Sequence, residues 1–195
     1  HAAIADDFLG AVKTLSRRIR VGDPLDDRTK VGAMISADHM EKVAGYVTAA
    51  KTDGGNVFAG GTRLQSNAGQ YLDPTIVCNV TEDMAIAREE VFGPVLSVLT
   101  FETIEKALHI ANNTPYGLSA GVWSASIDTC MSVARGVRSG TVWVNTFMEG
   151  YPELPFGGYK QSGLGRELGK RAVEDYTEEK TIQFHRGQRT GWWVG

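Results

Sequence analysis

The chain has 195 residues, of which 42% are hydrophobic and 22% charged, with a formal net charge of -3. This length and composition are typical of one globular domain and exclude a disordered chain. No apolar run approaches the ~18 residues that span a bilayer, and the basic residues form no cluster that would attract a phosphate backbone. We therefore expect neither a membrane nor a nucleic acid as a partner.

The first expected element is an amphipathic helix over residues 2–19. Its apolar residues recur at three-to-four spacing: Ile4, Phe8, Leu9, Ala11, Val12, Leu15 and Ile19. No basic segment followed by an apolar core begins the chain, so we expect no secretion signal. Because the chain starts with His1 and almost directly with a helix, we expect it to be a piece of a longer protein.

A second helix is expected to begin after Ser36 and to end at Asp53-Gly54-Gly55, and a short strand follows at 56–59. Strands and helices then alternate. The further strands are expected at 75–80, 95–101, 118–123, 141–145 and 180–184, and the further helices at 84–89, 104–112, 127–137 and 166–175. Thr103 is the expected N-cap of the helix over 104–112.

This alternation predicts an α/β fold with a largely parallel sheet and helices on both of its faces. Near the end, Thr181, Gln183 and His185 alternate with Ile182 and Phe184. Such a period of two is typical of a strand with one wet face, at an edge or between subunits. We therefore divide the chain into a domain over 1–177 and a C-terminal strand and tail over 178–195.

The most informative stretch is 89–95, Glu-Glu-Val-Phe-Gly-Pro-Val. Pro94 fixes the start of an apolar strand, so Glu90 and Phe92 are expected on a loop at a strand end, where α/β folds often bind ligands. From the residues alone, the alternative is a solvated helix end followed by one core aromatic. The motif by itself leaves both open.

The 89–95 stretch resembles a signature of the aldehyde dehydrogenase family. Five further blocks continue the resemblance in order, at 112–118, 140–145, 155–163, 165–169 and 176–181. The resemblance implies the C-terminal portion of that family's catalytic domain, with NAD or NADP as cofactor and an aldehyde as substrate. The resemblance extends to relatives of the betaine aldehyde type, and it implies a homo-oligomer built through the C-terminal strand region.

The resemblance also implies two cofactor-binding residues. Glu90 is expected to accept hydrogen bonds from the hydroxyls of the nicotinamide ribose, because a carboxylate only accepts and the ribose offers two donors. Phe92 is expected to limit the movement of the nicotinamide ring by contact with it. Preference between NAD and NADP is not encoded in these residues.

The loop over 146–156 corresponds, through the same resemblance, to the aldehyde entry channel. Phe156 matches an aromatic position that lines the channel, and Phe147 and Tyr151 are further candidates. The alternative is that all three are ordinary core or surface aromatics. Glu149 and Glu153 share the loop with these π faces, and this mixture suggests a cationic aldehyde as substrate. The alternative reading of the two carboxylates is a solvated loop.

The glycines at 163, 165 and 169 resemble the glycine-rich motif that binds dinucleotides. That motif requires its first glycine directly after a strand and a final spacing of two residues. Here residues 146–162 intervene after the strand, and the last spacing is three. We therefore expect these glycines to serve a tight loop and close helix packing, and a free-standing dinucleotide domain is the less favoured reading.

No residue of this chain is expected to perform the chemistry. The implied reaction oxidises the aldehyde to a carboxylic acid through a cysteine thiohemiacetal and thioester, with a carboxylate as general base. Cys78 is expected in a strand and Cys130 in a helix, both as inert packing, so the nucleophile, base and dinucleotide domain are expected elsewhere. The alternative is a non-catalytic binding or assembly module.

The histidines and cysteines bear on metals and on the compartment. His1, His39, His109 and His185 are dispersed and show no ligand spacing, so no metal site is expected. Two cysteines are too few for a disulfide framework, which suggests a reducing cytoplasm.

Overall fold

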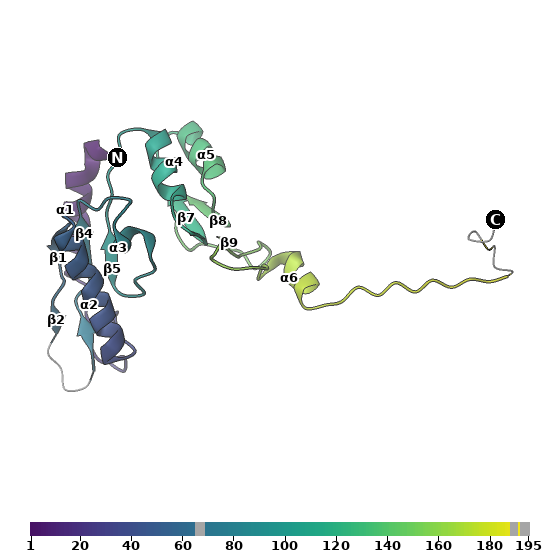
Figure 1. Ribbon diagram of the computed structural model, residues 1–195, viewed down its shortest axis with the longest axis horizontal. Coiled ribbons are helices and arrows are strands. Elements are labelled where there is room, and N and C mark those ends of the chain that lie inside the picture. The colour runs from purple at the N-terminus through teal and green to yellow at the C-terminus, as the bar shows by residue number, and fades with distance from the viewer. Residues whose placement is uncertain (65–68, 188–190, 192–195) are drawn as a thin grey trace.

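The structure is a computed structural model that describes residues 1–64, 69–187 and 191. Its first part contains a three-stranded sheet in the order β1 (Asn56–Ala59), β4 (Thr75–Cys78) and β5 (Val95–Ser97). β1 runs antiparallel to β4, and β5 runs parallel to it. The helices of this part are α1 (Ala5–Ser16), preceded by the 3-10 turn η1 (Ala2–Ile4), α2 (Ala37–Thr52) and α3 (Ala85–Arg88) (Figure 1).

The core of this part lies on both sides of β4, whose four residues are all buried. Ile76 and Cys78 pack with Leu9 of α1. Val77, which points to the opposite face because strand side chains alternate, packs with Ala50 of α2. A small antiparallel pair, β2 (Arg63–Leu64) and β3 (Tyr71–Leu72), extends beyond this sheet.

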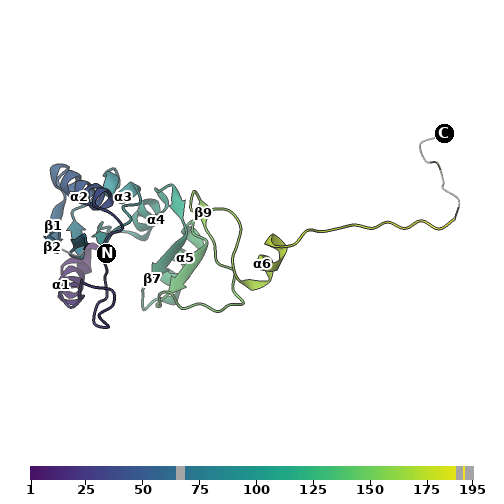
Figure 2. The same ribbon diagram turned by 90° about the horizontal axis from the view of Figure 1, so that it is seen from below.

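The second part follows through α4 (Ile104–Asn112). β7 (Ser119–Val122), α5 (Ile127–Gly136) and β8 (Thr141–Val144) form a crossover whose two strands pair in parallel. A short antiparallel pair joins β6 (Tyr116–Gly117) to β9 (Tyr159–Lys160), and α6 (Gly169–Asp175) follows. Figure 2 shows α5 beside β7, and α6 at the start of the extended C-terminal segment.

The α/β class is confirmed, whereas the expectation of one largely parallel sheet is wrong for the described residues. They form a three-stranded mixed sheet and three separate two-stranded sheets. The alternation correctly predicts the crossovers β4–α3–β5 and β7–α5–β8. It does not determine which strands become neighbours, and the two parallel pairs do not join.

The expected C-terminal strand is also not present as a strand. After α6 the chain runs away from the rest of the molecule as an extended segment, shown in yellow in Figure 1, and residues 178–187 have no strand assignment. Ile182 and Phe184 are each 82% exposed. A period of two indicates which residues share a face, but a strand also needs backbone pairing with a neighbour, and no such pairing is assigned to residues 178–187. Residues 188–190 and 192–195 of the predicted tail lie outside the description.

The helix starts agree more closely with the sequence. The Ser36 side chain accepts a hydrogen bond from the backbone N–H of His39 at 3.1 Å, and Thr103 accepts one from that of Lys106 at 3.2 Å. The predicted N-cap Thr103 and the predicted helix start after Ser36 are therefore confirmed. The helix expected to run to residue 19 ends at Ser16, and the one expected from 166 begins at Gly169.

Candidate cofactor and substrate site

The loop over 89–94 connects α3 to β5. Thr75 of β4 donates its backbone N–H to the carbonyl oxygen of Pro94 at 2.8 Å, which fixes the loop at the start of β5. The loop therefore lies at the amino end of the parallel pair β4–β5, not at the carboxyl end where ligands of open α/β sheets usually bind. The sequence correctly predicts a strand-end loop but does not predict which end of the sheet carries it.

Both cofactor candidates in this loop point away from the core. Glu90 is exposed, and the Phe92 side chain is 74% exposed. The alternative reading of Phe92 as a core aromatic is therefore wrong. An exposed acceptor and an exposed aromatic face two residues apart fit the ribose hydroxyls and the ring of a nicotinamide nucleotide.

Phe92 also has a strained backbone, with φ at 55°. A residue with a Cβ in the left-handed region costs about 1–2 kcal/mol relative to the right-handed one. Surrounding structure must therefore hold it there, and such strain is concentrated at functional sites.

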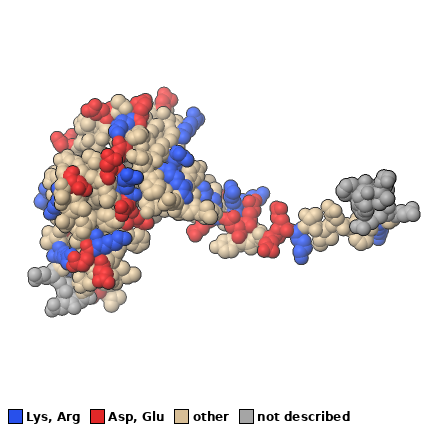
Figure 3. Space-filling view, in the orientation of Figure 1, with Lys and Arg blue, Asp and Glu red and all other residues tan. Residues whose placement is uncertain are grey.

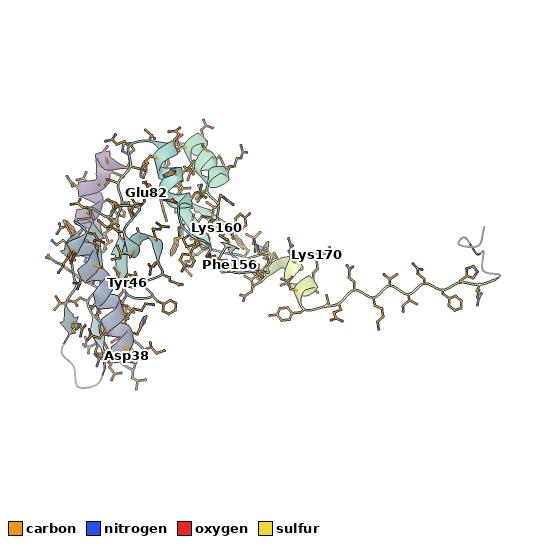
Figure 4. The ribbon with its side chains drawn as sticks, in the orientation of Figure 1. Asp38, Tyr46, Glu82, Phe156, Lys160 and Lys170 are labelled. Atoms are coloured by element: carbon orange, nitrogen blue, oxygen red, sulfur yellow. The ribbon has the colours of Figure 1, made fainter. Side chains whose placement is uncertain are left out.

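The loop is held by α2. The Tyr46 hydroxyl donates to Glu89 Oε2 at 2.6 Å, and this hydrogen bond is the main cause of a raised Tyr46 pKa. Figure 4 labels Tyr46 on α2, with Asp38 at the start of the same helix. The backbone of Gly93 lies against Val43, since a Cβ built on Gly93 would be 2.8 Å from Val43 Cγ1. His39 of α2 also holds the loop, through a hydrogen bond to the Phe92 backbone and a contact between the two rings.

Two of the three substrate candidates lie on an exposed loop after β8. Phe147 is 60% exposed and Tyr151 70% exposed. The rings of Phe147 and Trp143 meet edge to face with centroids 5.2 Å apart, and Trp143 Nε1 donates to the carbonyl oxygen of Glu149 at 2.7 Å. The loop thus presents aromatic faces near two acidic residues, Glu149 and Glu153, both exposed.

The third candidate, Phe156, is half-buried beyond this loop. Its backbone exchanges two hydrogen bonds of 2.7 Å with Glu167. It lines a hollow together with Gly157, Gly158 and Arg166, and Figure 4 labels it between Lys160 and Lys170. The residues lining this hollow include neither Phe147 nor Tyr151. Among the described residues, the cofactor candidates therefore lie beside α2 and the substrate candidates lie after β8, in separate places.

The glycine run has the geometry of a tight loop. Gly163, Gly165 and Gly169 have φ values of 135°, 75° and 61°. A Cβ on Gly169 would lie 2.8 Å from the carbonyl oxygen of Glu153, so the backbones approach closely there. These observations support the structural interpretation, since left-handed positions and close approach both favour glycine.

Sequence reasoning missed Lys160, the last residue of β9. Its Nζ donates to the carbonyl oxygens of Asn112 and Thr114 at 3.0 and 3.1 Å, and burial lowers its pKa. It therefore ties β9 to the end of α4 (Figure 4). The only available signal was that Lys160 lies in the family-like block 155–163 and both of its partners lie in the block 112–118.

Sequence reasoning also missed Glu82, between β4 and α3. Its carboxylate accepts hydrogen bonds from Lys106 Nζ at 2.5 Å and Asn113 Nδ2 at 3.0 Å, and these bonds lower its pKa. His109 Nε2 lies 3.1 Å from the same carboxylate. Glu82 therefore connects the first sheet to α4, across the junction of the two parts.

Both thiols are buried and free, Cys78 at the end of β4 and Cys130 within α5. Across residues 1–64 and 69–187, no group of three or more His, Cys, Asp or Glu side chains could hold a metal ion. Within the same ranges, no helix is both long and apolar enough to cross a membrane. Acidic and basic side chains are interspersed on the face seen in Figure 3.

Comparison with known proteins defines the class. The model of the aldehyde dehydrogenase family matches residues 1–182. The chain is 44% identical over 183 residues to betaine aldehyde dehydrogenase of Bacillus subtilis, covering 92% of this chain and 37% of that protein. It is 42% identical over 189 residues to 4-trimethylaminobutyraldehyde dehydrogenase of Rattus norvegicus, covering 94% and 38%. This chain belongs to the aldehyde dehydrogenase family.

Solved structures of aldehyde dehydrogenases also match this chain. The NAD-dependent aldehyde dehydrogenase of Sinorhizobium meliloti superposes with a TM-score of 0.92 at 47% identity, covering 98% of this chain and 38% of that one. The chain therefore spans less than two-fifths of the length of these relatives.

Proposed function

We propose that the protein containing this chain is an NAD(P)-dependent aldehyde dehydrogenase that oxidises an aldehyde to a carboxylic acid. The observation that carries the proposal is the exposed pair Glu90 and Phe92 on a loop held by α2, within a chain of this family. One structural relative is named an NAD-dependent aldehyde dehydrogenase. The cofactor, when bound, supplies the hydride acceptor.

The role of this chain is positioning. The Glu90 carboxylate would accept hydrogen bonds from the ribose hydroxyls, and the Phe92 ring would limit the movement of the nicotinamide. A displacement of the reacting centres by about 1 Å can slow a reaction by about 100-fold, so such restraint has a direct effect on rate.

The nucleophile and the general base would come from other segments of the protein. Cys130 is fully buried and Cys78 is 7% exposed, so neither thiol is accessible to an aldehyde. A buried thiol in apolar surroundings is inert packing. We therefore propose that this chain alone does not oxidise aldehydes, and that the thiohemiacetal and thioester form on a cysteine outside its 195 residues.

We further propose that the aldehyde is cationic and that Phe147, Tyr151 and Phe156 line its path. Two relatives are named for betaine aldehyde and 4-trimethylaminobutyraldehyde. Exposed aromatic faces stabilise a quaternary ammonium, and the nearby carboxylates of Glu149 and Glu153 favour the same charge. The proposal predicts a higher kcat/KM for betaine aldehyde than for a neutral aldehyde of similar length, and equal values would contradict it.

The organisation proposed for the chain assigns residues 1–177 to the catalytic domain and 178–195 to contacts with another copy. The 82% exposure of Ile182 and Phe184 supports it, because extended apolar residues gain from burial against a partner. The two free thiols favour the cytoplasm as the compartment.

The function is tested by turnover. The full protein, mixed with NAD or NADP and an aldehyde, is expected to form reduced nicotinamide and the carboxylic acid in equal amounts. The isolated chain is expected to form neither. Absence of turnover by the full protein with a panel of neutral and cationic aldehydes would overturn the proposal, and the non-catalytic assembly module would then be favoured.

A further inference from the structure

Val91 of the loop over 89–93 packs against the core cluster that contains Met40 and Val43 of α2. Three further contacts join the loop to one face of the same helix. His39, Val43 and Tyr46 follow one another at spacings of four and three, so they lie on one side of the helix. Their partners are Phe92, Gly93 and Glu89. One helix face therefore contacts both ends of the loop that carries the two cofactor candidates.

The contact between His39 and Phe92 has two components. The His39 Nε2 lies 2.7 Å from the carbonyl oxygen of Phe92, and because a carbonyl only accepts, the ring must carry its proton on Nε2. The two rings meet edge to face at 71°, with centroids 6.1 Å apart. The same histidine thus contacts both the backbone and the side chain of Phe92.

His39 is itself fixed. It lies in the first turn of α2, where its backbone N–H donates to the Ser36 N-cap at 3.1 Å. The adjacent Met40 and Val43 are buried in the core. The imidazole therefore projects from a rigid helix end, as a side chain that positions another must do.

The conformation of Phe92 requires restraint from a neighbouring side chain. Its φ of 55° is a conformation that residues with a Cβ avoid, and its ring is largely exposed, so core packing does not fix it. The contacts of Glu89 and Gly93 and the packing of Val91 restrain the neighbouring residues, whereas the His39 contact acts on Phe92 itself.

We propose that His39 is a positioning residue that holds the strained Phe92 in the conformation in which its ring restrains the nicotinamide. The inference rests on the proposed function, because it takes the Phe92 ring as a cofactor contact. His39 acts through Phe92 and not on the substrate.

Three variants of the full protein separate the components. His39→Ala removes both contacts, His39→Gln keeps an N–H donor without the ring, and His39→Phe keeps a ring without the donor. Asp38→Ala, which changes the exposed neighbour in the same helical turn, is the matched control. Crystal structures of wild type and His39→Ala give the φ of residue 92 directly.

In His39→Ala, residue 92 is expected to leave the left-handed region or to occupy two conformations. Because a misplacement near 1 Å can cost about 100-fold, kcat is expected to fall by about 10-fold to about 100-fold. KM for the aldehyde should change little, and Asp38→Ala should match wild type in both measurements. If His39→Gln keeps the wild-type φ of residue 92 and the wild-type kcat, the hydrogen bond positions Phe92. If His39→Phe keeps them, the ring contact positions it.

Retention of the φ of residue 92 in His39→Ala, with kcat within about twofold of wild type, would overturn the inference, since that change is far below the loss a misplaced ring causes. Failure of the His39 inference can be distinguished from failure of the proposed function. Fluorescence titration with NADH measures whether Glu90→Ala weakens binding. If Glu90→Ala weakens NADH binding while His39→Ala leaves the φ of residue 92 and kcat unchanged, the proposed function stands and only the role of His39 is rejected.

Discussion

The Tyr46 hydroxyl on α2 donates a hydrogen bond of 2.6 Å to the carboxylate of Glu89, 43 residues away along the chain. This bond fixes the first residue of the loop that presents Glu90 and Phe92. It is also the largest cause of the raised Tyr46 pKa, because ionising the phenol would remove the donor and place a charge beside a carboxylate.

The raised Tyr46 pKa predicts a loss of stability at alkaline pH. A group whose pKa is higher in the folded state contributes stability that is full below its unfolded pKa, about 10 for tyrosine, and lost as pH rises through the folded pKa. Tyr46→Phe should therefore lower the melting temperature at neutral pH, and the difference from wild type should shrink above about pH 10. Tyr176→Phe, at an 87% exposed tyrosine, is the control. A difference that is constant with pH would contradict this account.

Glu82 predicts the opposite pH dependence. Hydrogen bonds from Lys106 and Asn113 lower its pKa, so its contribution is full above the unfolded pKa, about 4.3, and lost as pH falls through the folded pKa. Glu82→Gln should melt at a lower temperature than wild type near neutral pH and at a similar temperature in acid. Glu105→Gln, at an exposed residue in the first turn of α4, should match wild type at both. Calorimetry across this range tests the prediction.

Gly140 should tolerate no side chain. A Cβ there would lie 1.7 Å from the carbonyl oxygen of Gly157, so Gly140→Ala must displace the backbone that leads to Phe156. We expect destabilisation above about 4 kcal/mol, the exceptional range for a single substitution. Gly45→Ala is the matched control, because nothing lies within 4 Å of its Cβ in the interior of α2. That change should stabilise the protein by about 0.5–1 kcal/mol. Denaturant unfolding measures both.

Substitutions of Phe92 should affect turnover far more than the free energy of unfolding. Its side chain is 74% exposed, so Phe92→Ala should change the free energy of unfolding by no more than about 0.5 kcal/mol. Phe92→Gly should stabilise the loop by about 1 kcal/mol, because glycine adopts a φ of 55° without strain. Both variants should slow turnover by about 100-fold. A large loss of stability with unchanged kcat would show that Phe92 is a packing residue.

The parts of the fold that depend on local chemistry were predictable from the sequence. Ser36 and Thr103 cap their helices as their side chains indicate, and Cys78 and Cys130 are buried as strand and helix residues. Strand neighbours were not predictable, because pairing depends on contacts far apart in the chain. The segment around Ile182 shows the same limit, since alternation identifies a face but not a partner.

The candidate site was predictable only in part. The residues alone left Phe92 open between core and ligand contact, and the structure excludes the core. The long-range bonds of Lys160 and Glu82, which join β9 and the first sheet to α4, were not predictable, because their partners lie 24 to 48 residues away in the chain. A lysine or a glutamate in a polar stretch gives no sign of such a partner.

The most direct test of the account is the dissociation constant of NADH from the full protein, measured for wild type, Glu90→Ala and Glu105→Ala. Hydrogen bonds to a charged group contribute about 1.5–3 kcal/mol, so Glu90→Ala should weaken binding by at least about 10-fold. Glu105→Ala removes an exposed carboxylate on α4 and should bind as wild type does. Equal dissociation constants for all three proteins would contradict the claim that this loop holds the nicotinamide half of the cofactor.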